Sequence, residues 1–129
     1  MKYEFALDIQ EKAEEISQIL FPHVQIHNIM CFRSYGTSSR LTIARCHALG
    51  KILQKALGRP AFYVLEFLSE RFDKLGEEDQ TKIIMHELMH IPKTFGGGFK
   101  HHDFVCDRNI NKYCREYKIK KERNEAKED

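Results

Sequence analysis

Two histidines four positions apart, with a glutamate directly after the first, are the residues of this chain best suited to chemistry. They are His86, Glu87 and His90, within the stretch HELMHIPKTFGGGFKHH. On a helix, residues four apart lie on the same face, so both imidazoles can converge on one Zn²⁺ at about 2.0–2.1 Å each. Glu87 lies about 100° further round the helix, where its carboxylate can reach a water molecule instead of the metal. The pattern predicts a zinc site with Glu87 as its general base.

The third ligand must come from outside this helix, because a catalytic zinc usually has three protein ligands and an open fourth position. Three consecutive glycines at positions 96–98 allow the chain to turn back sharply toward the metal. His101 and His102 follow this loop, and Glu116 is a competing candidate further along. We expect a histidine, because two of them lie where the chain returns. The spacing alone leaves His101 and His102 as alternatives.

A zinc site closed by four protein ligands is the alternative, and it would make the domain a non-catalytic, structural or interaction module. Both candidate histidines, or a cysteine such as Cys46 or Cys106, could then complete the coordination. None of the four cysteines forms a Cys-x-x-Cys pair, so a zinc ribbon is not indicated and we expect free thiols. Under this alternative Glu87 would have no role.

The composition is typical of one soluble globular domain. The chain has 129 residues, of which 42% are hydrophobic and 31% charged. It opens without a secretory leader and has no apolar run of membrane-spanning length, so we expect a cytoplasmic protein. The net charge of +2 gives no reason to expect a nucleic-acid partner. We place a single domain at residues 1–117 and interpret residues 118–129, which are almost all charged, as a flexible tail.

Hydrophobic periodicity predicts the order helix-strand-helix-strand-helix-helix, which indicates a compact α+β domain. The expected helices cover residues 5–20, 40–57, 77–91 and 103–117. The expected strands cover residues 24–35 and 62–68, and residues 69–75 connect the second strand to the third helix, with room for a short strand. Glu66 interrupts the apolar run of the second strand, which indicates that one face of this strand meets a cleft.

The stretch HELMHIPKTFGGGFKHHDFVCDR, with VLEFLSERFDKLGEED before it, resembles the small metallopeptidases of archaea and phages, zincins related to the SprT-like group. The resemblance covers about residues 30–117. It implies a minimal zincin fold, in which a small mixed sheet packs with the active-site helix and flanking helices. It also implies that His101 is the third ligand, with His102 in reserve, because the family's hydrophobic residue and Asp-Arg pair then follow at the right spacing. SprT-like chains have a glycine after the third histidine, and His102 takes that place here.

The function implied by the resemblance is zinc-dependent hydrolysis of peptide bonds in a peptide or protein substrate. The strand at residues 62–68 could hold an extended substrate by pairing beside it. Such sites often contain a second electrophile. Four side chains outside the motif could supply it: Tyr113, Tyr117, Arg108 and His47.

The SprT-like analogy further implies a protease that acts on DNA-associated proteins. Several basic side chains could contact phosphates: Arg33, Arg40, Lys51, Lys55 and the basic run of residues 118–123. Acidic residues are interleaved through the tail, which favours solvated faces over a DNA-binding surface. DNA is therefore the weaker of the expected partners.

Overall fold

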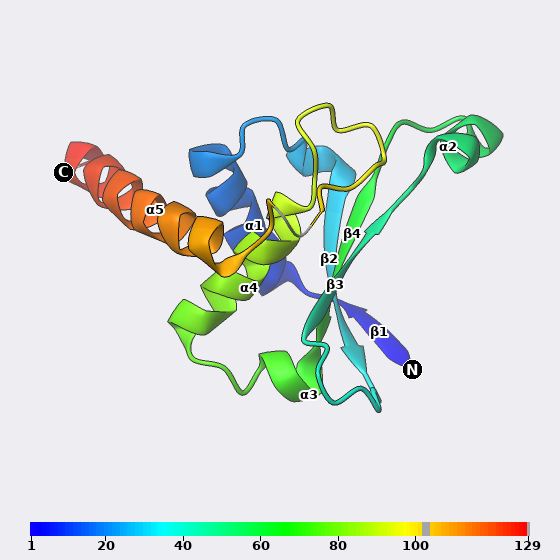
Figure 1. Cartoon of the computed structure of the whole chain (residues 1–129), viewed down its shortest axis with the longest axis horizontal. Helices are drawn as coiled ribbons and strands as arrows, with labels where there is room; N and C mark the ends of the chain where they lie inside the picture. Colours follow the sequence, from blue (N-terminus) through cyan, green and yellow to red (C-terminus); the bar gives the residue numbers. More distant parts are fainter. Residues whose placement is uncertain (102–103, 129) are drawn as a thin grey trace.

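Three helices cover one face of a four-stranded sheet in the computed structural model of the chain (Figure 1). The structure describes residues 1–101 and 104–128. The strands are β1 (Lys2–Phe5), β2 (Ile29–Tyr35), β3 (Ala44–Ala48) and β4 (Tyr63–Leu68). The helices in the described part are α1 (Leu7–Leu20), α2 (Lys51–Leu57), α3 (Ser69–Phe72), α4 (Glu77–Met89), α5 (Asp107–Glu128) and the 3-10 helix η1 (Ile26–Asn28). This is the α+β architecture with a small mixed sheet that the sequence predicted.

The sheet has the order β1-β2-β4-β3, so strands that are consecutive along the chain are not always neighbours. β2 and β4 are parallel, whereas β1 and β3 pair antiparallel with β2 and β4 respectively. β4 is therefore a central strand with a partner on each side. β3 is an edge strand, and within the described residues it is the strand that approaches α4.

The hydrophobic core lies between one face of the sheet and helices α1, α4 and α5. Side chains alternate along a strand, and Tyr63, Leu65 and Phe67 of β4 all point to this face and are fully buried. Each helix contributes an apolar stripe to the core: Ile9, Ala13 and Ile16 from α1, Ile84, Met85 and Leu88 from α4, and Ile110, Cys114 and Tyr117 from α5. This packing determines how α4 is rotated about its axis, and hence where its polar residues point.

The predicted helix over residues 40–57 is wrong in its first part. Residues 44–48 form β3, which pairs with β4, and only residues 51–57 are helical. Gly50 separates the two elements, and Gly58 ends the helix in the left-handed conformation, with a φ of 64°. Pairing with a buried central strand outweighs the helical spacing of the apolar residues, because strand formation depends on the neighbour that a segment meets.

The N-terminal residues also differ from the prediction. Residues 2–5 form β1, so the first helix begins at Leu7 and not at Phe5. The strand expected at residues 24–35 begins only at Ile29, after the short helix η1, and the expected connector contains helix α3. Strand β1 forms because β2 offers it an unpaired edge, which a local pattern does not reveal.

Helix α5 begins at Asp107 and continues to Glu128, so the end expected at residue 117 is wrong. The charged segment after Tyr117 is helical, and Lys121 contacts Glu15 of α1 at 3.2 Å. The division of the chain into a domain of residues 1–117 and a tail stays a prediction. Among the described residues, no helix combines the length and the apolarity needed to cross a bilayer.

Substitution of Leu65 tests the position of the hydrophobic core. It is fully buried at the centre of the sheet, so truncation to alanine removes apolar contacts and leaves a cavity. We expect Leu65→Ala to lower the free energy of unfolding by about 2–5 kcal/mol in urea denaturation followed by circular dichroism. The control is Ile119→Ala on α5, where the side chain is exposed and the change should stay within about 0.5 kcal/mol. Equal effects of the two substitutions would contradict this core.

Candidate metal centre

The last turn of α4 carries the His-Glu-x-x-His motif. His86 and Glu87 lie within the helix, and His90 is its C-cap residue with helical backbone angles, φ −69° and ψ −18°. Acidic residues 77–79 occupy the first turn, where the helix dipole favours negative charge. Pro92 follows the C-cap, and a proline at this position cannot continue the helix. The two histidines therefore keep the helical spacing that places their rings on one face.

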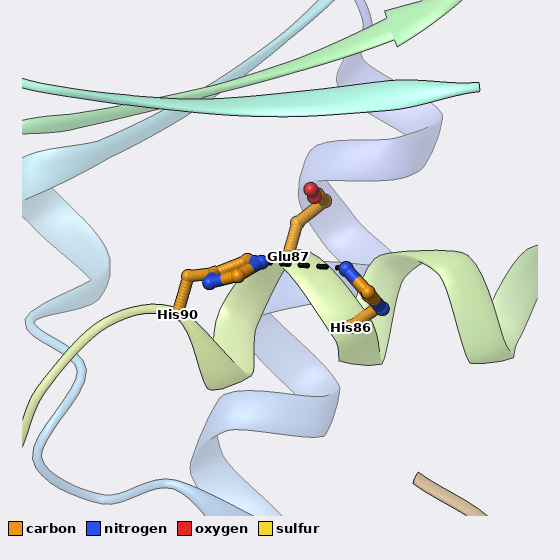
Figure 2. Close-up of side chains that lie close together, drawn as sticks. All are labelled: His86, Glu87 and His90. Atoms are coloured by element: carbon orange, nitrogen blue, oxygen red, sulfur yellow. Dashed lines mark hydrogen bonds between the residues drawn. The ribbon is translucent and has the colours of Figure 1, made fainter. Parts of the chain in front are cut away.

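The ring nitrogens of the two histidines lie close enough to share one metal ion. Nε2 of His86 and Nε2 of His90 are 3.3 Å apart (Figure 2). Two nitrogens bound at about 2.0–2.1 Å to one tetrahedral zinc are separated by about 3.3–3.4 Å. One ligand atom from each of His86, Glu87 and His90 lies within 4.8 Å of the others. The arrangement thus fits a metal ion, whereas a direct N–H···N hydrogen bond would usually be shorter, about 2.9–3.0 Å.

Hydrogen bonds to Lys100 set the orientation of the His90 ring. His90 Nδ1 lies 2.8 Å from the carbonyl oxygen of Lys100, and the Lys100 N–H donates to the carbonyl of His90 at 2.7 Å. A carbonyl oxygen only accepts, so Nδ1 carries the proton and Nε2 of the neutral ring keeps its lone pair. Such a partner on the second ring nitrogen is a usual feature of histidines that bind metals.

The glycine-rich loop after α4 is attached to β4 and α2. The Tyr63 hydroxyl accepts from the Gly97 N–H at 2.9 Å and donates to the Gly98 carbonyl at 2.7 Å. The Gln54 side chain donates to the Gly96 carbonyl at 3.0 Å. Gly97 has a φ of 101°, and a Cβ there would lie 2.6 Å from the Gln54 amide nitrogen. The sequence analysis missed Tyr63 and Gln54, because no local pattern links them to a loop more than thirty residues away.

The carboxylate of Glu87 is buried beside the histidines. Only 4% of this residue is exposed, and its Oε2 has no hydrogen-bond partner among the described residues. Burial raises the pKa of Glu87 to about 7. Figure 2 shows the side chain pointing from α4 toward the sheet. A buried carboxylate without a partner costs stability, and such groups are typical of sites that bind ions or transfer protons.

His101 is exposed and does not join the cluster that the described residues form. Its carbonyl accepts from the N–H groups of Phe104 and Val105, both at 3.1 Å. Its assignment as third ligand therefore stays a proposal. His102, the reserve candidate, lies outside the described residues, and the half-buried Glu116 of α5 is likewise not part of the cluster.

The side chains considered as a second electrophile have other contacts. The Tyr117 hydroxyl donates to Glu15 at 2.8 Å, and the Tyr113 ring packs edge-on against Phe21 at a centroid distance of 5.2 Å. Arg108 is exposed in the first turn of α5. Neither Cys46 nor Cys106 belongs to the described metal cluster, and both are free thiols. None of these contacts indicates a role in the chemistry of the motif.

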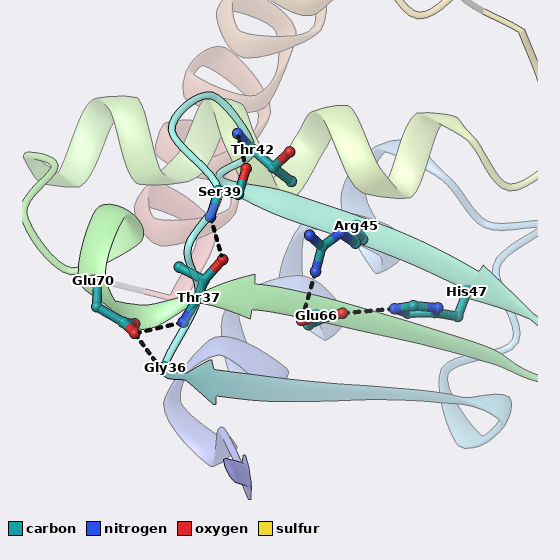
Figure 3. Close-up of polar contacts among 8 residues, drawn as sticks. All are labelled: Gly36, Thr37, Ser39, Thr42, Arg45, His47, Glu66 and Glu70. Atoms are coloured by element: carbon teal, nitrogen blue, oxygen red, sulfur yellow. Dashed lines mark hydrogen bonds and ion pairs between the residues drawn. The ribbon is translucent and has the colours of Figure 1, made fainter. Parts of the chain in front are cut away.

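Glu66 points to the opposite face of the sheet from Leu65 and lies between Arg45 and His47 of β3 (Figure 3). Arg45 Nη1 is 3.2 Å from one carboxylate oxygen, and His47 Nε2 is 2.8 Å from the other. These contacts across to β3 account for the carboxylate in the apolar strand, and the cleft expected beside Glu66 stays a prediction. His47 is thus engaged on the outer face of the sheet, away from α4.

Two further expectations are corrected by the sheet. The strand predicted to bind substrate, β4, has both edges paired, so only β3 offers a free edge beside α4. Arg33, a candidate phosphate contact, is part of the fold instead: it contacts Asp8 at 2.6 Å and Asp73 at 3.1 Å. Arg40 lies in the loop before β3, and Lys51 and Lys55 lie on α2; all three are exposed.

The pKa of Glu87 makes the stability of the metal-free protein depend on pH. The unfolded carboxyl has a pKa of 4.5 and the folded one about 7, so the folded state binds the proton more tightly. The contribution of this carboxyl group to the free energy of unfolding is fully present below pH about 4.5. It is lost as the pH rises through about 7, and the total loss is on the order of 3 kcal/mol. The glutamine of Glu87→Gln cannot ionise, so this variant should not lose that stability. We expect urea denaturation of the two metal-free proteins to show a difference in unfolding free energy that grows with pH, and parallel profiles would contradict the burial of a carboxylate.

Comparison with known proteins gives one match that spans nearly the whole chain. The family model described as "Putative phage metallopeptidase" matches residues 1–127, a range that includes the helix with His86, Glu87 and His90. Neither the curated proteins nor the solved structures contain a match to this chain. Metallopeptidases require a metal ion and act on peptides or proteins, and the histidine-glutamate cluster is compatible with that requirement. The chain therefore belongs to the phage metallopeptidase family.

Proposed function

We propose that this protein is a zinc-dependent metallopeptidase in which Glu87 is the general base. The observation that carries the proposal is the buried Glu87 carboxylate, without a partner on Oε2 among the described residues, beside two imidazole nitrogens 3.3 Å apart. Family membership supports the reaction class. The donor set favours zinc among the common metals, because two imidazoles with an acidic neighbour are typical of zinc sites.

His86 and His90 would bind the zinc ion through Nε2, and His101 is the proposed third ligand. The two hydrogen bonds between His90 and Lys100 support this choice, because they hold the residue that precedes His101 against the histidine pair. A zinc ion held there would supply Lewis acidity, which makes water a better nucleophile near neutral pH and polarises a peptide carbonyl. A third protein ligand would leave one coordination position open for chemistry.

Glu87 acts as the proton carrier in the proposed mechanism. Its carboxylate accepts the proton of the attacking water and passes it to the leaving amine nitrogen as the peptide bond breaks. A pKa raised to about 7 by burial suits both steps, because the group can hold or release a proton near neutral pH. The Lys100 carbonyl keeps His90 in the tautomer whose Nε2 can act as a metal ligand.

The free edge of β3 is the proposed binding place for the peptide backbone of the substrate. An extended segment can add to an exposed sheet edge through main-chain hydrogen bonds. β3 is the strand that contacts α4, so a peptide paired there would lie near the motif. β4 cannot play this role, because β2 and β3 occupy its two edges.

Glu87→Gln separates proton transfer from metal binding. Glutamine has nearly the same shape but cannot take up a proton, so zinc should be retained while hydrolysis of fluorescently labelled casein falls by about 10²–10⁴-fold. The matched control is Glu122→Gln on the exposed surface of α5, which should leave the rate unchanged. Full activity of Glu87→Gln would show that another group is the base.

Replacement of single histidines tests the ligand set. Elemental analysis of the purified wild-type protein should find about one zinc per chain, and His86→Ala should lose most of it. We expect His101→Ala to lose most of the zinc and His102→Ala to lose little. Loss only in His102→Ala would reverse the assignment. Retention in both variants would show that the third ligand is neither histidine, with Glu116 as the next residue to replace.

A further inference from the structure

Helix α2 exposes its apolar side chains. It contains no buried residue, and Ile52, Leu53 and Leu57 are 82%, 51% and 60% exposed. Figure 1 shows α2 standing apart from the helices that cover the other face of the sheet. Neighbouring exposed aliphatic residues are uncommon on a soluble protein and often mark an interaction site.

The exposed residues of α2 form two adjacent stripes. Successive residues are about 100° apart around a helix, so Gln54 faces the body of the protein while Ile52, Leu53 and Leu57 cover one side. Lys51 and Lys55 lie on the adjoining flank. We call these five exposed residues the α2 surface: Lys51, Ile52, Leu53, Lys55 and Leu57. It presents an aliphatic stripe beside a cationic one.

The charge on α2 and on the turn after it has a single sign. The segment of residues 16–65 contains six lysines and arginines and no aspartate or glutamate, although the chain has 19 acidic residues. Of these six, Lys51, Lys55 and Arg59 lie on α2 or directly after it, and all three are exposed. The other three precede α2 along the chain, and Arg33 and Arg45 among them are paired with acidic residues. The helix and the turn after it therefore form a region of positive charge. That region is complementary to an acidic partner.

The α2 surface is connected to the metal centre through the glycine-rich loop. Gln54, on the inner side of α2, donates to Leu49 at 2.7 Å and to Gly96 of the loop at 3.0 Å. The same loop leads to Lys100, whose backbone is hydrogen-bonded to His90. β3, with its free edge, ends just before α2 begins. A protein chain that is bound at the metal centre and extends along β3 would therefore reach the α2 surface.

We propose that the α2 surface is a docking site for an acidic, amphipathic segment of the substrate protein. The proposal rests on the proposed function, since it takes the partner to be a substrate. The aliphatic stripe would bury apolar side chains of that segment, and the lysines would pair with its carboxylates. α2 carries no aromatic ring on which bases could stack, which disfavours single-stranded nucleic acid. Its connection to the metal centre favours a protein chain over a lipid surface.

The test measures binding without hydrolysis. The probe is a fluorescent peptide of repeated Glu-Leu-Leu-Glu units, and the protein is the zinc-loaded full chain carrying Glu87→Gln, so that the peptide is not cut. We expect fluorescence anisotropy to show binding that weakens as salt is added. Adding Ile52→Ser and Leu57→Ser should weaken it about tenfold or more, because two apolar contacts are lost.

Matched controls distinguish binding at this surface from nonspecific binding. Ile119→Ser removes an aliphatic side chain that is 51% exposed on α5 and should leave the affinity unchanged. A peptide of repeated Lys-Leu-Leu-Lys units should bind at least tenfold more weakly than the acidic one. Charge reversal by Lys51→Glu and Lys55→Glu should remove this preference.

Several results would overturn the docking site. The proposal is wrong if the acidic peptide does not bind, or if it binds equally well to the unsubstituted and serine-substituted surfaces. It is also wrong if the basic peptide binds as tightly as the acidic one. Tighter binding of phosphatidylglycerol vesicles or single-stranded DNA through the same residues would also overturn it, in favour of that partner. Because the readout is binding, its failure overturns the docking site alone. Failure of the wild-type protein to hydrolyse casein or any other peptide bond would overturn the proposed function instead.

Discussion

The packing of α4 between the sheet and helices α1 and α5 is the constraint on which the metal centre depends. Ile84, Met85 and Leu88 are drawn into the core, and this rotates α4 so that His86 and His90 share the remaining face. Glu87 is then carried to the boundary between helix and sheet, where its carboxylate is buried. The hydrophobic stabilisation of the helix offsets the cost of a buried carboxyl group, and the raised pKa of Glu87 is the result.

A second set of contacts connects this helix to the glycine-rich loop. Tyr63 holds the loop from the central strand, and Gln54 holds it from α2. Lys100, at the end of the loop, fixes the ring of His90 through its backbone. The loop thus links three elements that are distant along the chain. Gly97 is the glycine that the loop needs, because a Cβ there would lie 2.6 Å from the Gln54 amide nitrogen.

The two faces of the sheet have different chemistry. One face forms the core with the three large helices, and the other carries the ion pair of Glu66 with Arg45 and its hydrogen bond with His47. β3 lies at the edge between them and leads into α2, so the free edge, the basic segment and the exposed aliphatic residues follow one another along the chain. In this arrangement recognition of a substrate and hydrolysis would use neighbouring but separate residues, which allows either to change without loss of the other.

The α+β class, the helix with the His-Glu-x-x-His motif and the central strand were predictable from the sequence, because each depends on spacing within one segment. The ends of α4 followed from its acidic first turn and from Pro92 for the same reason. Strands β1 and β3 were missed, because a strand forms where a partner edge is available, and that edge comes from a distant part of the chain. The sequence by itself determined that two imidazoles and a carboxylate would meet on one helix. Only the tertiary structure decided that Glu87 is buried, that Lys100 orients His90 and that β3 is the edge strand beside α4, because burial and long-range hydrogen bonds arise when separate segments pack together.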